Sequence, residues 1–433
     1  MSFMRVPVHG RGDSTLPLLL HGYAWLPNRL RETAGAPVRT HLLGHPAIAL
    51  HGPQAVSFFY DEQNVRRSGA VPEPVLDTLF GRGAVHTLDG AAHRVRKALF
   101  LSLLKDPDGV AALTGDAVRE WRESVAEHRG GAVVLFDTAA EALARAVCAW
   151  VGLAPTPDQA RLMAHDCVAM LDGFASPGLR HLRARHSRNR QEAALAALIT
   201  AVREGRQPVR DGSALAAVAG HRDVDGLPPD ERTCAVELLN IIRPTVGITW
   251  FITFAAHALH RHRDLAEELR TASGRQLRDL STAFAHEVRR FYPFVPFVGG
   301  VAARNLTWQG IRIQQGTMVL LDVYGHHHDP ALWDNPYHFT PARFTADPDA
   351  VERIVAQGGG DPALGHRCPG EDITVSVLAA FTAELAHLDH EVPDQDLTIP
   401  LSRIPTRPHS GFVLHLAPAP ADAAAGPPSR PGS

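Results

Sequence analysis

The chain has 433 residues, of which 45% are hydrophobic and 21% charged, and its formal net charge is -3. These values fit a globular protein with a large core, and the near-neutral charge gives no field that would favour nucleic acid or an acidic membrane surface. The four cysteines, Cys148, Cys167, Cys234 and Cys368, form neither a CxxC pair nor a zinc spacing. They favour a reduced, cytoplasmic setting, and the first residues contain no apolar signal segment.

The first half of the chain is predicted to be mostly helical. After a polar arm with aromatic residues, positions 38–50 predict two short strands joined by Gly44-His45. Gly52-Pro53 opens a helix that runs to about Tyr60, because proline suits the first helical position. Residues 92–205 have apolar positions at helical spacing, with breaks near Pro155–Pro157 and Ser176–Gly178.

The second half predicts further helices around a small β portion. A long helix is expected from about Pro229 to His260, because Pro228-Pro229-Asp230-Glu231 is a good start signal. The remaining expected elements are a helix over 276–291, strands over 301–308 and 311–323 joined by a turn at Gln309-Gly310, and a helix over 371–388. We expect one catalytic domain over 1–417 and a disordered Ala/Pro/Gly/Ser-rich tail over 418–433.

The segment 238–260 is long and apolar enough to be mistaken for a membrane span. However, Asn240, Arg243 and Pro244 lie inside it, and a guanidinium is costly in lipid. A helix buried in a large protein core is therefore the better interpretation.

Residues 357–371, QGGGDPALGHRCPGE, place one cysteine between a glycine-rich loop and a helix that begins near Glu371. Glycines allow a backbone to approach a flat cofactor closely, and a helix N-terminus stabilises a thiolate. One thiolate is sufficient to bind haem iron. Taken alone, Cys368 is equally compatible with an inert cysteine in a turn.

With this loop the chain resembles the cytochrome P-450 superfamily over nearly its whole length. Ile354 or Val355 stands where the superfamily usually has Phe, the loop is longer, and Arg367 directly precedes Cys368. This form is similar to the bacterial fatty-acid peroxygenases, which include fatty-acid α- and β-hydroxylases and alkene-forming decarboxylases. The resemblance implies a mainly α fold with a minor β portion, with haem b between a long central helix and the cysteine loop, and Cys368 as the axial iron ligand.

A second motif supports the resemblance. Glu287 and Arg290 are three positions apart in the predicted 276–291 helix, so their side chains share a face. An exposed helix pair of this kind contributes little. In the superfamily the same pattern is a buried pair completed by a second arginine, which here would be Arg343. Such a network would fix the loop that carries Cys368.

Arg243-Pro244 breaks two local rules at adjacent positions, because it places a charge and a helix breaker in an apolar helix. Ordinary superfamily members have an acid–alcohol pair here for delivering protons to dioxygen. The resemblance implies that Arg243 instead clamps the carboxylate of a substrate, which then serves as general acid–base for hydrogen peroxide. The alternative is that Arg243 pairs with a carboxylate of the protein itself.

The segment from Phe80 to Lys97 resembles a loop and helix of the same branch. His93 and Lys97, four positions apart, fit the binding of haem propionates, although a solvated basic face remains an alternative. We expect Arg96 and Gly370 to contribute to the cofactor site as well. His86 is expected over the haem, where decarboxylating members have His, unless it points elsewhere.

The resemblance implies a peroxide-dependent enzyme that oxidises a carboxylic acid, expected to be a fatty acid, at Cα or Cβ or decarboxylates it to a terminal alkene, without a redox partner or a membrane. The alkyl chain needs an apolar tunnel. Candidates, each of which also suits an ordinary core position, are Phe80, Val85, Leu171, Phe174, Phe291, Phe294 and Val295. The alternatives are a conventional monooxygenase with a reductase, a non-catalytic haem sensor or carrier, and a peroxygenase for another carboxylic acid.

Overall fold

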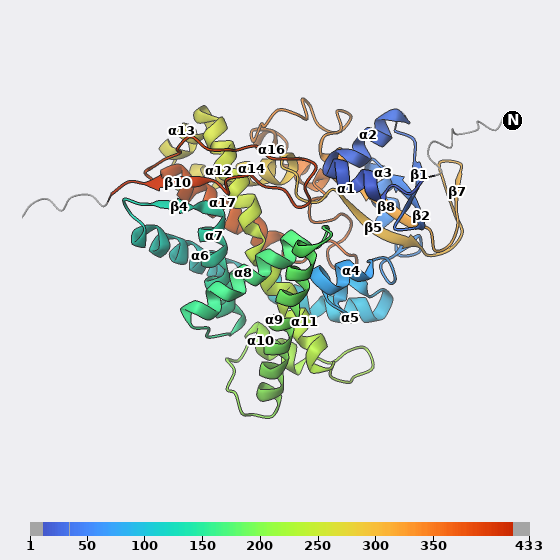
Figure 1. Cartoon of the computed structure of the whole chain (residues 1–433), viewed down its shortest axis with the longest axis horizontal. Coiled ribbons are helices and arrows are strands. Elements are labelled where there is room, and N and C mark those ends of the chain that lie inside the picture. The colour runs from blue at the N-terminus through green and yellow to red at the C-terminus, as the bar shows by residue number, and fades with distance from the viewer. Residues whose placement is uncertain (1–11, 34, 419–433) are drawn as a thin grey trace, which may run out of the picture.

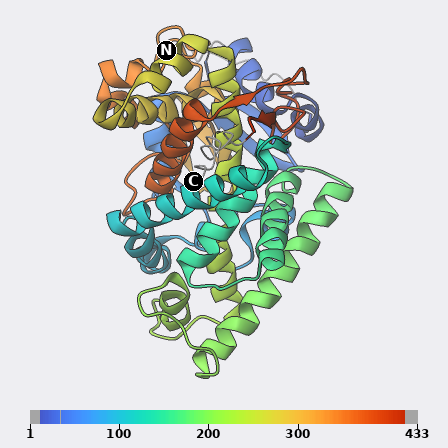
Figure 2. The same cartoon turned by 90° about the vertical axis from the view of Figure 1, so that its left-hand side faces the viewer.

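The structure is a computed structural model that describes residues 12–33 and 35–418. Helices dominate it, as predicted, and the strands form small sheets beside them (Figure 1). The longer helices are α5 (Gly90–Leu104), α6 (Pro107–Glu127), α7 (Leu135–Val151), α8 (Pro157–Gly173), α9 (Leu179–Arg203), α11 (Glu231–Val246), α12 (Ile248–Arg261), α14 (Gly274–Phe291) and α17 (Glu371–His387). In Figure 2 the orange-red helix α17 lies beside the teal helices, and the long green α9 descends along the opposite side.

Shorter helices and single turns connect these elements. The helices are α1 (Thr15–His21), α2 (Trp25–Glu32), α3 (Pro53–Tyr60), α4 (Glu73–Val75), α10 (Ala214–Gly220), α13 (Arg263–Thr271), α15 (Tyr324–His327) and α16 (Arg343–Ala346). The turns η1 (Gly22–Ala24), η3 (Val85–Thr87) and η4 (Pro348–Arg353) are 3-10 helices, and η2 (Leu76–Phe80) is a π-helix.

Local sequence explains where several helices begin. Asp106 caps α6 by accepting a hydrogen bond from the backbone of Gly109, and Asp230 caps α11 in the same way from Thr233. Thr156 and Gln159 form a reciprocal capping box at the start of α8. Each cap satisfies backbone N–H groups that have no partner within the helix.

The predicted long helix forms the centre of the molecule, but it is two segments. It breaks at Gly247, three residues after Pro244, which removes one backbone donor from the ladder. Helix α11 packs against α7, α8 and α9, whereas α12 packs against α7, α14 and α17. The stretch Glu231–Arg261 is long and apolar enough to cross a membrane by length and composition, but 94% of its apolar window is buried inside the protein. A core helix is therefore the correct interpretation of this stretch.

The β portion is divided into three sheets. The largest has the order β1-β2-β8-β5-β3 and joins β1 (Val38–Leu42), β2 (His45–Leu50), β8 (Met318–Asp322), β5 (Phe297–Ala302) and β3 (Val65–Arg66). Only β2 and β8 run parallel in it; the other neighbours are antiparallel. The others are β4-β10-β9, from β4 (Ala132–Val134), β10 (Val413–Leu416) and β9 (His390–Glu391), and the hairpin of β6 (Leu306–Trp308) and β7 (Ile311–Ile313).

Two expectations for the elements were wrong. Part of the predicted polar arm, from Thr15 to Glu32, forms helices α1 and α2, and α2 buries an apolar face of Trp25, Leu26 and Leu30. The region 92–205 also has breaks after Leu104 and around β4 that composition did not reveal. The tail prediction for 418–433 lies, apart from Pro418, outside the described residues.

Candidate active site

Cys368 lies in the turn that precedes α17, as expected. Its backbone N–H donates to the carbonyl of Gln357 at 2.8 Å, which closes the loop upon itself. Burial raises the pKa of the Cys368 thiol, while the backbone N–H of Gly370 and the charge of Lys97 act in the opposite direction. The loop thus supplies a donor to the sulfur, which is what a metal thiolate requires.

The glycines of the loop serve a purpose that the sequence analysis did not anticipate. Gly358 has a φ of +96°, and a Cβ built on it would lie 2.9 Å from the hydroxyl of Tyr60. A Cβ on Gly359 would lie 2.6 Å from Val56. The close approach that these glycines permit in the structure is therefore to α3, which supports the loop from behind.

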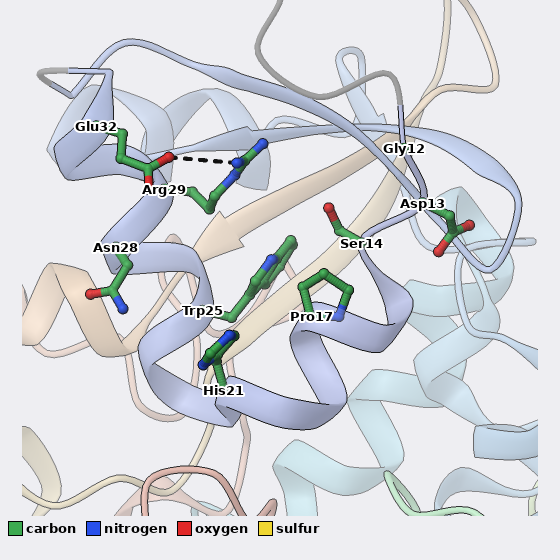
Figure 3. Close-up of a pocket in the computed structure, with 9 residues that line it drawn as sticks. All are labelled: Gly12, Asp13, Ser14, Pro17, His21, Trp25, Asn28, Arg29 and Glu32. Atoms are coloured by element: carbon green, nitrogen blue, oxygen red, sulfur yellow. Dashed lines mark hydrogen bonds and ion pairs between the residues drawn. The ribbon is translucent and has the colours of Figure 1, made fainter.

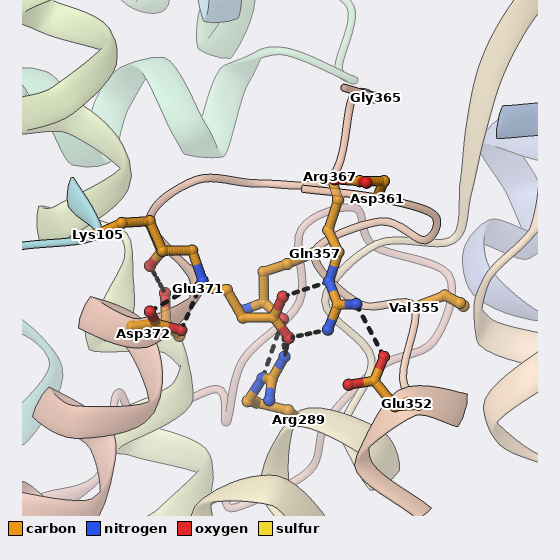
Figure 4. A network of polar contacts seen from close by, with 12 residues as sticks. Lys105, Arg289, Glu352, Val355, Gln357, Asp361, Gly365, Arg367, Glu371 and Asp372 are labelled. Atoms are coloured by element: carbon orange, nitrogen blue, oxygen red, sulfur yellow. Dashed lines mark hydrogen bonds and ion pairs between the residues drawn. The ribbon is translucent and has the colours of Figure 1, made fainter. Parts of the chain in front are cut away.

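Glu371 anchors the cysteine loop through a network that the sequence analysis missed (Figure 4). Arg289 is 1% exposed; it pairs with Glu371 and donates twice to the side-chain oxygen of Gln357, at 2.7 and 3.0 Å. Arg367 donates to Glu371 at 2.7 Å and to Glu352 at 3.1 Å. The Arg289 guanidinium therefore holds both ends of the loop, Gln357 and Glu371, to α14.

The Glu287 network has the geometry that the resemblance implied. Glu287 and Arg290 are fully buried and form two hydrogen bonds, at 2.6 and 2.7 Å. Arg343 donates to Glu287 at 3.1 Å, and Arg290 also donates to the carbonyls of His327 and Pro336 at 2.8 Å. The network ties α14 to the segment that precedes the cysteine loop. The Glu287–Arg290 pair is therefore a buried connection within the fold and not an exposed ion pair on a helix surface.

Arg243 is buried in α11 without a counter-charge. The residue is 4% exposed; among the residues that the structure describes, its Nε has no partner and its one hydrogen bond runs to Oδ1 of Asn240 at 3.1 Å. Burial and the like charge of Arg188 lower the pKa of Arg243 to about 9. Within residues 12–33 and 35–418, no carboxylate forms an ion pair with it. The alternative of an internal partner thus finds no support.

His86 and Phe80 lie next to this guanidinium. The ring centroids of Phe80 and His86 are 4.6 Å apart, and the guanidinium carbon of Arg243 lies 5.9 Å from the Phe80 centroid. Burial and the charge of Arg243 lower the pKa of His86 well below its ordinary value, and its Nδ1 has no partner. His86 is therefore a neutral imidazole close to the predicted clamp.

Helix α5 faces the cysteine loop with two of its three expected residues. Lys97 donates to the carbonyls of Gly365 and Arg367, and burial lowers its pKa to about 8. His93 is 1% exposed and stacks on His366 with ring centroids 3.9 Å apart. Arg96, which was expected at the cofactor, instead pairs with Asp223 and, at 2.8 Å, with Glu237, and these two carboxylates occupy its guanidinium.

The expected haem fits the residues around Cys368. His93 Nδ1 and His366 Nε2 are buried without hydrogen-bond partners, with oxygens of Glu62 and Asp89 at 3.8 and 3.7 Å, so both nitrogens remain available to the carboxylates of propionates. His366 was missed in the sequence, although it lies two positions before the cysteine. Pro244 is exposed although every other residue from Cys234 to Ala256 is buried, so the centre of the helix borders an open space. These features are those of a cradle for a large, flat, anionic group.

The predicted tunnel residues lie at the border of the main core. Leu171 and Val85 are buried in it, and Phe80, Phe174 and Phe294 pack against it while remaining partly exposed. The Phe294 ring lies 4.4 Å from that of Phe251. Val295 is half-buried. This border position fits a tunnel lining, and the tunnel itself stays a prediction.

A pocket of about 390 Å³ at the N-terminal helices is a separate feature (Figure 3). It is lined by residues of α1, α2 and the segment before them, including Trp25, Asn28 and Glu32. None of the candidate active-site residues lines it, so its size does not make it the candidate active site.

Comparisons with known proteins agree with this geometry. The family model for cytochrome P-450 matches residues 245–401. Cytochrome P-450 4A10 of Mus musculus is 29% identical over 183 residues, and steroid 21-hydroxylase of Felis catus is 32% identical over 184 residues. These matches span 39% and 40% of the chain, but only 35% and 36% of the two relatives.

Solved structures match almost the whole chain. Cytochrome P450SP alpha (CYP152B1) in complex with (R)-ibuprophen is 38% identical, with a TM-score of 0.89 over 93% of this chain and 98% of that one. Cytochrome P450EX alpha (CYP152N1) with myristic acid is 34% identical, with a TM-score of 0.88 over 94% and 97%. Ligand-free cytochrome P-450 OleT is 33% identical, with a TM-score of 0.88 over 93% and 96%. The predicted fold is thus confirmed, and the chain belongs to the cytochrome P-450 family, in its CYP152 branch of fatty-acid peroxygenases.

Proposed function

We propose that this protein is a hydrogen peroxide-dependent peroxygenase that oxidises fatty acids at Cα or Cβ, by hydroxylation or by decarboxylation to terminal alkenes. The observation that carries this proposal is the buried, unpaired guanidinium of Arg243 in the central helix. A buried cation without a partner is costly unless an anion joins it. Relatives crystallised with myristic acid and arachidonic acid support a fatty-acid carboxylate as that anion.

The residues around Cys368 would hold the family's haem. Cys368 would bind the iron through its thiolate, Gly370 would donate its N–H to the sulfur, and His93, Lys97 and His366 would bind the propionates. When bound, haem supplies the redox chemistry that peroxide oxidation of an unactivated carbon requires. We propose no redox partner.

Arg243 would bind the substrate carboxylate through paired N–H donors and fix Cα and Cβ beside the cofactor. The bound carboxylate would then move a proton between the two peroxide oxygens, since among the described residues no carboxylate of the protein pairs with Arg243. Pro244, exposed in the same turn, would keep the helix open at this point. His86 would hold or supply a proton near the carboxylate and favour decarboxylation.

We further propose one catalytic domain over 1–417 that works in the cytoplasm without a membrane or nucleic acid. The burial of the apolar central helix supports the absence of a membrane span there. Reduced cysteines are consistent with that compartment, since Cys148 and Cys167 are buried and unpaired.

The decisive experiment is product analysis with a long-chain fatty acid and hydrogen peroxide, beside the same acid with a reductase and NADPH. Turnover with peroxide alone is expected, and turnover only with the reductase would establish a conventional monooxygenase. Arg243→Ala is expected to abolish the peroxide reaction. Arg203→Ala, which removes an ion pair with Glu231 at the distant end of α9, is the matched control and is expected to remain active. Full activity of Arg243→Ala would refute the clamp.

The choice of acid is tested separately. Titration of the ferric enzyme with acids of increasing chain length is expected to give a spectral shift with an optimum. No response to any fatty acid would favour a different carboxylic acid, and binding without turnover would favour a sensor or carrier.

A further inference from the structure

Among residues 12–33 and 35–418, Asn240 is the residue whose side chain accepts a hydrogen bond from the guanidinium of Arg243. The two residues are three positions apart in α11, so their side chains share a face of the helix. Asn240 is 4% exposed, and its Oδ1 accepts from Arg243 at 3.1 Å. A buried amide in the middle of an apolar helix costs free energy unless its polar atoms are satisfied. Its presence therefore needs an explanation beyond packing.

The other end of the Asn240 amide binds the loop that carries the remaining site residues. Its Nδ2 donates to the carbonyl of Phe80 at 3.0 Å and to Glu237 at 3.4 Å. Glu237 in turn accepts from the backbone N–H of Val85 at 2.7 Å and from Arg96 at 2.8 Å. Asn240 thus connects the clamp to both ends of the segment that joins Phe80 to His86.

Only an amide satisfies this arrangement. The atom that faces Arg243 must accept a hydrogen bond from the guanidinium. The atom on the opposite side must donate to the Phe80 carbonyl and to the Glu237 carboxylate. The neighbours therefore fix which way the amide points. Aspartate would accept on both sides and face Glu237 with a like charge, and leucine would do neither.

We propose that Asn240 is a positioning residue that sets the direction of the Arg243 guanidinium relative to His86 and thereby selects between Cα and Cβ as the oxidised carbon. The inference rests on the proposed function, because the selected carbon depends on where the clamp holds the carboxylate. The guanidinium retains its charge without Asn240 but loses its fixed direction. A substrate carboxylate bound to it then samples more than one position above the cofactor.

The fold does not depend on this amide alone. Arg188 is 1% exposed and donates to the carbonyls of Leu79 and Phe80 at 2.6 and 2.8 Å. The Phe80 carbonyl therefore keeps a donor when Asn240 is replaced. Asn240→Leu, which keeps the branching and the number of side-chain heavy atoms, should consequently fold and load haem.

The test compares Asn240→Leu and Asn240→Asp with the wild type. Measured are the ratio of Cα to Cβ products with peroxide, the dissociation constant of the acid from the spectral shift of the ferric enzyme, and the thermal midpoint. The control is Gln191→Leu, which removes a buried amide that binds Asp166 between α9 and α8. It controls for the loss of any buried amide.

Asn240→Leu is expected to change the product ratio severalfold while the acid still binds. Asn240→Asp is expected to raise the dissociation constant roughly a hundredfold, because an internal carboxylate then pairs with Arg243 and competes with the substrate. Gln191→Leu should lower the thermal midpoint and leave ratio and binding unchanged. An unchanged product ratio in Asn240→Leu, with a midpoint like that of the control, would overturn the inference.

Failure of the proposed function gives a different pattern. If the wild type binds acids but does not turn them over with peroxide, the proposed function fails. The role of Asn240 is then tested by the dissociation constants of the acid alone. Equal dissociation constants for the wild type and both variants would then overturn the inference as well. A selective loss of binding in Asn240→Asp would support it.

Discussion

Replacement of Arg243 by methionine is expected to make the protein more stable and unable to bind its substrate. The guanidinium is 4% exposed, has an unpaired Nε and faces the like charge of Arg188, so the substrate-free protein bears the cost of a buried, uncompensated cation. Replacing buried ions by apolar groups of similar volume stabilises proteins by about 1–4 kcal/mol. We expect a gain of this order in the free energy of unfolding.

The same substitution removes the charged partner of the carboxylate. A desolvated, hydrogen-bonded charge pair at an interface contributes about 2–5 kcal/mol when one member is truncated, which corresponds to a dissociation constant raised roughly thirtyfold to several thousandfold. Urea unfolding gives the first quantity, and the spectral titration with a fatty acid gives the second.

Arg290→Met is the matched control, because Arg290 is equally buried but fully paired with Glu287. It is expected to destabilise the protein by about 3–5 kcal/mol, since it leaves a buried carboxylate without its partner. The reasoning would be refuted if Arg243→Met were less stable than the wild type, or if it bound the acid as tightly.

Three further outcomes are expected. His86→Gln should lower the alkene fraction of the products measured by gas chromatography, and an unchanged ratio would count against a role of His86. Glu371→Ala should accelerate transfer of haem to apomyoglobin, because Arg289 and Arg367 lose the carboxylate that they share, and a rate equal to the wild type would contradict that anchor. Burial lowers the pKa of His326 and of His328 to about 4 each. Between pH 6.5 and 4 these histidines are protonated in the unfolded chain but stay neutral in the folded protein. The free energy of unfolding should therefore fall as pH decreases from 6.5 towards 4, by about 3 kcal/mol for each ring. Urea midpoints between pH 7 and pH 4 test this, and a midpoint that stays constant would contradict it.

The sequence predicted residues whose partners are close along the chain or belong to a known pattern. Glu287 and Arg290 share one helical turn, and Arg343 followed from the resemblance. The boundaries of β1, β2 and α3 followed from Gly44 and Pro53, because glycine readily adopts the positive φ of a turn and proline fixes φ at the start of a helix. Pro244 likewise predicted a disturbance of the central helix. It did not predict that the helix ends at Val246.

What the sequence did not predict depends on contacts between distant positions. Arg289 meets Gln357 and Glu371, which are 68 and 82 residues away, and such pairs leave no periodic pattern. Arg96 shares its helix face with residues expected at the cofactor, yet Asp223 and Glu237 engage it from other elements. Tertiary packing decides which buried cations meet a carboxylate, and within residues 12–33 and 35–418 Arg243 forms no ion pair.

The break at Gly247 has a mechanical consequence. The half of the central helix that carries Arg243 packs on α8 and α9, and the half beyond the break packs on α14 and α17, the helix that follows Cys368. A Cβ at Gly247 would lie 3.0 Å from a methyl carbon of Leu171, so the break itself packs against α8. Arg243 and the helix that follows Cys368 thus pack with different helices on either side of Gly247. A change in the tilt of α8 and α9 would therefore alter the distance between Arg243 and Cys368.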